Sequence, residues 1–131
     1  MKKETKTLHV GLQYSDRKQA EIFFTKILNL HLNKTFSLSK ELSNEIFKIN
    51  EKVTVDVYCN KKSYFEIFIT KIKNKNSFNH ICIEIDNKQV LTERCKKYNI
   101  EPLFVKKGEK TLLFIRDFSD NLFEIKERQK N

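Results

Sequence analysis

The 131-residue chain is predicted to form an α+β domain of two βαβββ modules. We expect their strands to form a curved mixed sheet around a cup, with the helices on the outer face. Three observations predict this fold: a strand-like segment that begins near a His and ends at an Asp occurs twice, a helical pattern follows each copy, and each half ends on a similar Phe-Glu-Ile strand. The modules should span about 7–71 and 78–127 of one domain, 1–131.

A helix is predicted at the start of each module. The opening strands end at Asp16 and Asp86, and each Asp is followed three residues later by a Gln. This spacing is typical of a helix N-terminus, where the Asp side chain caps free backbone N–H groups. Apolar residues then recur at helical spacing over 17–29 and 87–98.

Three strands are predicted after each helix, because short apolar and alternating runs follow it. In the first module they cover about 32–38, 47–58 with a break near 50–52, and 64–70. In the second they cover about 103–106, 111–116 and 121–127. Residues 39–45 suit a short helical turn, and the Lys- and Asn-rich stretch 71–77 connects the modules.

Strand alternation predicts a metal site in the cup. One side of each first and last strand is apolar and can pack beneath a helix, so the other side faces the cup. That side carries His9 and Glu66 in the first module and His80 and Glu124 in the second. A single His or Glu on a strand is usually a surface residue, but these pairs occupy matching positions. Two imidazoles and two carboxylates suit a divalent ion such as Zn²⁺, Ni²⁺, Fe²⁺ or Mn²⁺.

Other polar residues are candidates for substrate contacts. Arg116 on a predicted strand could pair with an anionic group, although a solvated cation at a strand end is the plainer interpretation. The remaining candidates for the lining of the cup are Gln13, Asp56, Tyr58 and Glu84.

The charge of +9, from 26 basic and 17 acidic residues, raises the question of nucleic-acid binding. The lysines are spread along the whole chain among Asn and Ile, without an Arg-rich or Gly-rich patch. Nucleic acid is therefore not an expected partner, whereas a small anionic molecule is.

Composition also indicates the compartment. The three cysteines are widely spaced without a CxxC pair, so reduced thiols are expected. No apolar run is long enough to span a bilayer, and the N-terminal MKKETKTLHV lacks the apolar segment of a secretion signal. We expect a cytoplasmic protein without a membrane partner.

Four stretches resemble signature segments of the vicinal oxygen chelate superfamily of glyoxalases, bleomycin-resistance proteins and dioxygenases. They are LHVGLQYSDRKQAEIFFTKILNL, SYFEIFIT, FNHICIEID and LLFIRDFSDNLFEIKE, and the resemblance covers about 7–127. It implies one metal ligand on the first and last strand of each module, which by position are His9, Glu66, His80 and Glu124. This set is similar to that of bacterial glyoxalase I, where the metal binds two substrate oxygens and a ligand carboxylate moves a proton. The resemblance thus implies Glu66 and Glu124 as catalytic residues.

The chain departs from the family pattern in two turns. The turn before the last strand, usually Asp-Pro-Asp-Gly-Asn, is here Asp117-Phe-Ser-Asp-Asn121, and Asn29 stands where Gly usually follows the first helix. Asn tolerates the left-handed conformation, so the second turn should survive. No clear glutathione-binding signature is present, which leaves a thiol-adduct substrate unsupported.

The resemblance leaves several functions open. The favoured one is a metal-dependent lyase, isomerase or epimerase of the glyoxalase I type. The first alternative is a non-catalytic protein that binds a drug, as in the bleomycin-resistance members, which generally lack the four ligands. The second is a dioxygenase, which typically uses two His and one carboxylate in a longer chain. Fosfomycin-modifying enzymes share the fold, but their usual His/His/Glu set and potassium-binding loop are not located here. A homodimer is expected, with the cup either inside one chain or completed by exchange of modules.

Overall fold

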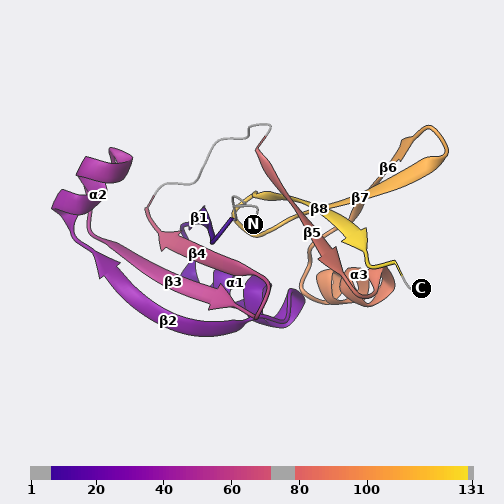
Figure 1. Cartoon of the computed structure of the whole chain (residues 1–131), viewed down its shortest axis with the longest axis horizontal. Helices are drawn as coiled ribbons and strands as arrows, with labels where there is room; N and C mark the ends of the chain where they lie inside the picture. The colour runs from indigo at the N-terminus through magenta and orange to yellow at the C-terminus, as the bar shows by residue number, and fades with distance from the viewer. Residues whose placement is uncertain (1–6, 72–78, 130–131) are drawn as a thin grey trace, which may run out of the picture.

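The computed structural model describes residues 7–71 and 79–129, which form two modules side by side (Figure 1). The first module contains β1 (Val10–Tyr14), α1 (Arg17–Glu21), η1 (Ile22–Ile27), β2 (His31–Leu38), α2 (Lys40–Phe47), β3 (Val53–Cys59) and β4 (Tyr64–Ile69). The second contains β5 (His80–Ile85), α3 (Lys88–Lys97), β6 (Leu103–Lys107), β7 (Lys110–Arg116) and β8 (Leu122–Glu127). The connecting stretch predicted at 71–77 lies almost wholly outside the described residues.

Each module forms its own four-stranded sheet. The strand orders are β1-β4-β3-β2 and β5-β8-β7-β6, so the first and last strands of a module are neighbours. These first–last pairs are parallel, and the other pairs are antiparallel. The α+β fold of two βαβββ modules is therefore confirmed, with the strands divided between two sheets.

The helix starts follow the capping rule, with one shift. Asp16 Oδ1 accepts a hydrogen bond from Gln19 N at 3.1 Å, as the sequence predicts. In the second module Asn87 Oδ1 accepts from Val90 N at 3.0 Å, so the cap is Asn87 and the prediction of Asp86 is wrong by one residue. An Asn side chain caps as well as an Asp side chain. Asp86 instead lies 3.3 Å from Arg128 Nη1.

The first helix widens into a π-helical segment after α1. Leu28 N donates to Phe23 O at 3.0 Å, a bond that spans five residues, and Asn29 then adopts a left-handed φ of 60°. Phe23, Phe24 and Ile27 of η1 are all fully buried. Asn29 thus takes the conformation expected of the usual Gly.

The two modules share one apolar core. Phe24 of η1 stacks on Tyr58 of the first sheet with ring centres 5.4 Å apart, and Phe23 lies 5.2 Å from Phe123 of the second sheet. Leu91 of α3 belongs to the same buried cluster. One helical segment therefore packs against both sheets, which fixes the modules relative to one another.

The middle of the first module contains a helix where a strand was partly predicted. Ser39 Oγ caps α2 by accepting from Leu42 N at 3.2 Å, and Lys48 ends the helix with a φ of 62°. The helical turn predicted at 39–45 is confirmed and is longer than expected, whereas the strand predicted from 47 begins only at Val53. Apolar residues at 42, 46 and 47 follow helical rather than strand spacing.

A buried carboxylate joins the first helix to the first sheet. Asp56 of β3 is 1% exposed and accepts hydrogen bonds from Arg17 Nε at 2.7 Å and Arg17 Nη2 at 2.8 Å. Thr35 Oγ1 on β2 donates to the same carboxylate at 2.6 Å. A buried charge needs such partners, so loss of either Arg17 or Thr35 would leave the Asp56 carboxylate poorly satisfied.

Cys59, Cys82 and Cys95 are free thiols in the structure. Among the described residues, no helix has both the length and the apolar character needed to cross a membrane.

Candidate metal centre

One His and one Glu come together at the parallel strand pair of each module. His9 Nε2 lies 3.5 Å from Glu66 Oε1 at the β1–β4 pair, and His80 Nε2 lies 3.8 Å from Glu124 Oε1 at the β5–β8 pair. The two carboxylates are mostly shielded from solvent, while about half of each imidazole is exposed. We call each His–Glu pair a half-site.

The two half-sites have the same register. Gly11 pairs with Glu66 across β1–β4, and Cys82 pairs with Glu124 across β5–β8. In each module the His therefore lies two residues before the partner of the Glu and on the same side of the sheet. Independent surface residues would have no reason to repeat this diagonal arrangement, which supports a duplicated function.

The His–Glu distances suit shared coordination better than direct hydrogen bonding. Hydrogen bonds to oxygen usually span about 2.7–3.2 Å, and both distances, 3.5 and 3.8 Å, are longer. Two ligands bound at about 2.1 Å to one tetrahedral ion would lie roughly 3.4 Å apart. Each half-site thus fits two adjacent positions around a divalent ion, and the donor types suit such an ion.

The two half-sites do not combine into one site within the described chain. Among residues 7–71 and 79–129, no three His, Cys, Asp or Glu side chains lie close enough together to hold a metal ion. The structure therefore brings together His9 with Glu66 and His80 with Glu124, and leaves the pairs apart. A catalytic ion usually needs at least three protein ligands, so one half-site is incomplete by itself.

Glu124 differs from Glu66 in its surroundings. Lys126 Nζ lies 3.5 Å from Glu124 Oε2, the carboxylate oxygen that does not face His80. Lys126 is well exposed, so the charge attraction is modest.

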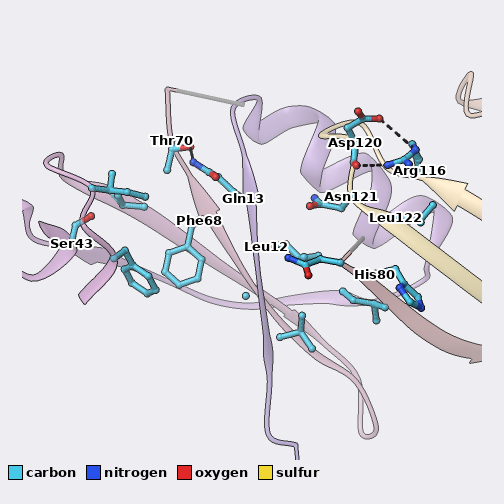
Figure 2. A pocket seen from close by; sticks show the side chains of 17 residues that line it. Leu12, Gln13, Ser43, Phe68, Thr70, His80, Arg116, Asp120, Asn121 and Leu122 are labelled. Atoms are coloured by element: carbon cyan, nitrogen blue, oxygen red, sulfur yellow. Dashed lines mark hydrogen bonds and ion pairs between the residues drawn. The ribbon is translucent and has the colours of Figure 1, made fainter. Parts of the chain in front are cut away.

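A cavity of about 700 Å³ lies between the modules, and His80 is the half-site residue that lines it (Figure 2). Gly11 and Gln13 line it from β1, His80 from β5 and Arg116 from β7. Gln13 Nε2 donates to Thr70 Oγ1 at 2.6 Å, which fixes the amide at the cavity wall. Gln13 and Arg116, two of the predicted substrate contacts, therefore both lie at this cavity.

Arg116 is held at the cavity edge by its own turn. Its Nη1 donates to Asp120 O at 3.0 Å, and its Nε lies 3.9 Å from Asp120 Oδ1 (Figure 2). Both side chains are partly exposed, so the guanidinium keeps donors for another acceptor.

Three other predicted contacts lie elsewhere. Tyr58 is buried on the helix side of β3 against Phe24, because it shares a side with Phe65 rather than with Glu66. Its predicted role in the cup is therefore not supported, and the same holds for Asp56. Glu84 lies on the His80 side of β5 but outside the cavity, is largely exposed, and lies 3.7 Å from Arg128 Nε.

Ser43 is a cavity residue that the sequence analysis missed. It lies on α2, is fully buried, and its Oγ has no hydrogen-bond partner among the described residues. It lines the cavity together with Phe47 and Phe68 (Figure 2). Ser43 falls within the helical turn predicted at 39–45, and nothing in the sequence indicated that this turn would border a cavity.

The turn before β8 is built around a buried carboxyl. Asp117 Oδ1 accepts from Ser119 N at 3.1 Å and Asn121 N at 2.7 Å, and Asp120 adopts a φ of 68°. Asp120 thus takes the left-handed position, and the Asp117 carboxyl closes the turn without Pro or Gly. Ser119 Oγ also donates to Gln13 O at 2.7 Å, which ties the turn to β1.

Asp117 should make stability depend on pH. Burial raises its pKa above the ordinary 3.8, and hydrogen bonds offset this only in part. The folded state therefore binds the proton of the Asp117 carboxyl more tightly than the unfolded state. Protonated Asp117 thus contributes to the free energy of unfolding below pH 3.8, and this contribution is lost as pH rises through the pKa of the folded state. We expect the free energy of unfolding of the native protein, relative to Asp117→Asn, to fall with rising pH in urea titrations. If the free energy of unfolding of the native protein instead rose with pH relative to Asp117→Asn, the raised pKa of Asp117 would be contradicted.

No family model matches the sequence, and no curated protein matches it. Solved structures do match. The fosfomycin resistance protein FosX from Listeria monocytogenes superposes with a TM-score of 0.71 at 18% identity, over 97% of this chain and 96% of that chain. FosX from Mesorhizobium loti gives a TM-score of 0.68 at 13% identity, over 95% and 92%. A glyoxalase family protein from Enterococcus faecalis gives 0.67 at 12% identity, over 94% and 96%.

The chain has the vicinal oxygen chelate fold. The resemblance inferred from the four sequence stretches is thus confirmed at the level of the fold, over nearly the whole chain. One structure with this fold, a mutant of FosX from Listeria monocytogenes, is complexed with Mn(II) and 1S,2S-dihydroxypropylphosphonic acid. At such low identity these similarities show a shared fold and leave the activity open.

Proposed function

We propose that the protein is a metal-dependent enzyme whose divalent ion is bound by two copies of the chain. His9 and Glu66 of one copy would supply half of the ligands, and His80 and Glu124 of the second copy would supply the rest. The observation that carries this proposal is the repeated half-site, with ligand-like His–Glu distances of 3.5 and 3.8 Å in the two modules. A two-fold dimer would unite each first half-site with the second half-site of its partner.

The proposed substrate is a small anionic molecule with two adjacent oxygen atoms. Arg116 supplies a guanidinium at the cavity edge, and the net charge of +9 favours anions in general. The amide of Gln13 offers a further polar contact in the same cavity. The phosphonate diol bound by the FosX structure has both features, adjacent oxygens and an anionic group, which supports this class.

The chemistry divides between the ion and the side chains. A bound divalent ion would polarise the two substrate oxygens and stabilise negative charge that develops on them. Arg116 would orient the substrate through its anionic group. Glu66 or Glu124 would accept a proton from the substrate, since each carboxylate lies at the half-site and is mostly shielded from solvent.

Two reaction types fit this arrangement. Proton transfer next to a carbonyl gives the lyase or isomerase activity of the glyoxalase type, as the ligand set suggests. Addition of water to a small phosphonate epoxide is the second candidate, because FosX structures are among the matched neighbours and one of them holds a phosphonate diol.

Metal content tests the proposal directly. Elemental mass spectrometry on untagged protein should find a divalent metal at a near-stoichiometric level, and the His9→Ala, Glu124→Ala double variant should lose it. The metal should also return when stripped native protein is dialysed against Mn²⁺, Zn²⁺, Ni²⁺ or Fe²⁺. A native protein that takes up none of these ions would refute the catalytic proposal and favour a cleft that binds a ligand without metal.

A further inference from the structure

The cavity between the modules has an apolar end and a polar end (Figure 2). The lining beside α2 consists of aromatic and aliphatic side chains, which are Phe47, Ile49, Val53 and Phe68. The lining from the second module is mostly polar, and the ionisable side chains of the cavity wall are His80, Arg116 and Asp120. A ligand that fills the cavity therefore meets apolar surface at one end and a guanidinium at the other.

Two aromatic rings form a corner at the apolar end. The ring centres of Phe47 and Phe68 are 5.1 Å apart, and the ring planes meet at 63°. Phe47 is 46% exposed although it is a large apolar side chain. A flat apolar group in this corner would stack on one ring and meet the edge of the other, which are the arrangements that aromatic groups prefer. It would also remove exposed apolar surface from water.

The corner lies next to the first half-site. Phe68 follows Glu66 by two residues on β4, so both side chains are on the same side of the sheet. The Phe68 ring lies against Gly11 of β1, where a Cβ atom would be only 3.1 Å from Phe68 Cε1. Gly11 is also the cross-strand partner of Glu66. The missing side chain at Gly11 thus leaves space for the ring beside the ligand pair.

The equivalent position of the second module holds a cation. Lys126 follows Glu124 by two residues, as Phe68 follows Glu66, and Lys126 Nζ lies 3.5 Å from Glu124 Oε2. The two half-sites therefore repeat the ligands but differ in the side chain that flanks them. Under the proposed function, an ion shared by both half-sites would have an aromatic ring on one side and an ammonium group on the other. Such surroundings favour an asymmetric substrate in one orientation.

We propose that Phe47 and Phe68 form an aromatic subsite, and that the substrate is a small anion that carries a flat apolar group such as an aryl ring. The anionic group pairs with Arg116, which keeps free donors because Asp120 accepts at only part of its guanidinium. The apolar group lies in the corner beside the first half-site. The identity of this ligand as a substrate rests on the proposed function. An aryl group would distinguish it from the phosphonate diol of the FosX structure, whose carbon skeleton is a propyl chain.

Isothermal titration calorimetry on EDTA-treated protein tests the subsite without any metal. Phenylphosphonate and methylphosphonate share the anionic group and differ in the apolar group. The native protein should bind phenylphosphonate at least about tenfold more tightly, equal to about 1.4 kcal/mol. Phe68→Ala and Phe47→Ala should each reduce this ratio to below about threefold, without changing the affinity for methylphosphonate.

Three controls separate the subsite from effects on folding and charge. Phe36→Ala should keep the native ratio, because Phe36 is an exposed ring on β2 outside the cavity. Arg116→Ala should weaken both ligands by the same factor. Circular dichroism should show each variant folded, and Phe47→Ala secures the test if Phe68→Ala does not fold, since Phe47 is already half-exposed.

Several outcomes would overturn the subsite. These are a native protein that binds both phosphonates equally or does not bind phenylphosphonate, a ratio that survives in the folded Phe47→Ala and Phe68→Ala variants, and a ratio that Phe36→Ala also abolishes. Arg116→Ala protein with native affinities would overturn the placement of the anionic group. A protein that shows the expected ratios yet takes up no divalent ion would refute the proposed function and leave the aromatic subsite intact.

Discussion

Mixing two metal-deficient variants should restore about one quarter of the metal sites. If each site takes its ligands from two copies, His9→Ala and His80→Ala each disrupt every site when alone. In a co-expressed mixture about half of the dimers contain one copy of each variant, and one of their two sites has all four ligands. Elemental mass spectrometry on the purified mixture should therefore find about a quarter of the native metal content.

The matched control combines His9→Ala with Glu66→Ala. Both changes affect the first half-site, so every site in every dimer lacks a ligand and no metal should return. The two mixtures contain equal numbers of substitutions and differ only in where these lie. If the His9→Ala and His80→Ala mixture binds no metal while both variants still form dimers, the four ligands would have to come from one chain.

Replacing Arg17 by Ala should destabilise the protein by about 3 kcal/mol, the lower end of the range for breaking a buried ion pair. Asp56 is 1% exposed and accepts two of its hydrogen bonds from this guanidinium. Its charge would remain buried with only the Thr35 hydroxyl to satisfy it. The lower end of the range applies because the Arg17 side chain is 53% exposed, so water already screens part of the attraction. Urea denaturation followed by circular dichroism measures the loss.

A second variant separates charge from packing. Asp56→Asn keeps the shape and an acceptor for Thr35 but removes the charge, so Arg17→Ala should cost much less in an Asp56→Asn background than in the native protein. Equal costs in both backgrounds would show that Arg17 contributes through its aliphatic stem rather than through the ion pair.

The elements with strong local signals could be predicted from the sequence. Asp16 and Gln19 mark the first helix start, and alternating apolar residues mark β4 and β8. The repeat of these signals in both halves predicted the duplicated module, and it placed each His beside its Glu. These features depend on short-range periodicity, which a single sequence displays directly.

The remaining features depend on competition between distant groups. The cap of α3 is Asn87, whereas Asp86 lies 3.3 Å from Arg128, a residue far along the chain. Tyr58 faces the core because the β3–β4 register pairs it with Phe65, and register was not readable from β3 alone. Likewise, nothing in the sequence showed that the four predicted ligands would fall into two separate pairs.

The parallel strand pairs that hold the half-sites also determine when they can form during synthesis. His9 and Glu66 are 57 positions apart, and they meet only after every other strand and helix of the first module has been made. The same is true of His80 and Glu124 in the second module. A nascent or truncated chain therefore presents only isolated ligands, with weak affinity for ions. Under the proposed function, binding of the ion would therefore follow completion of both modules.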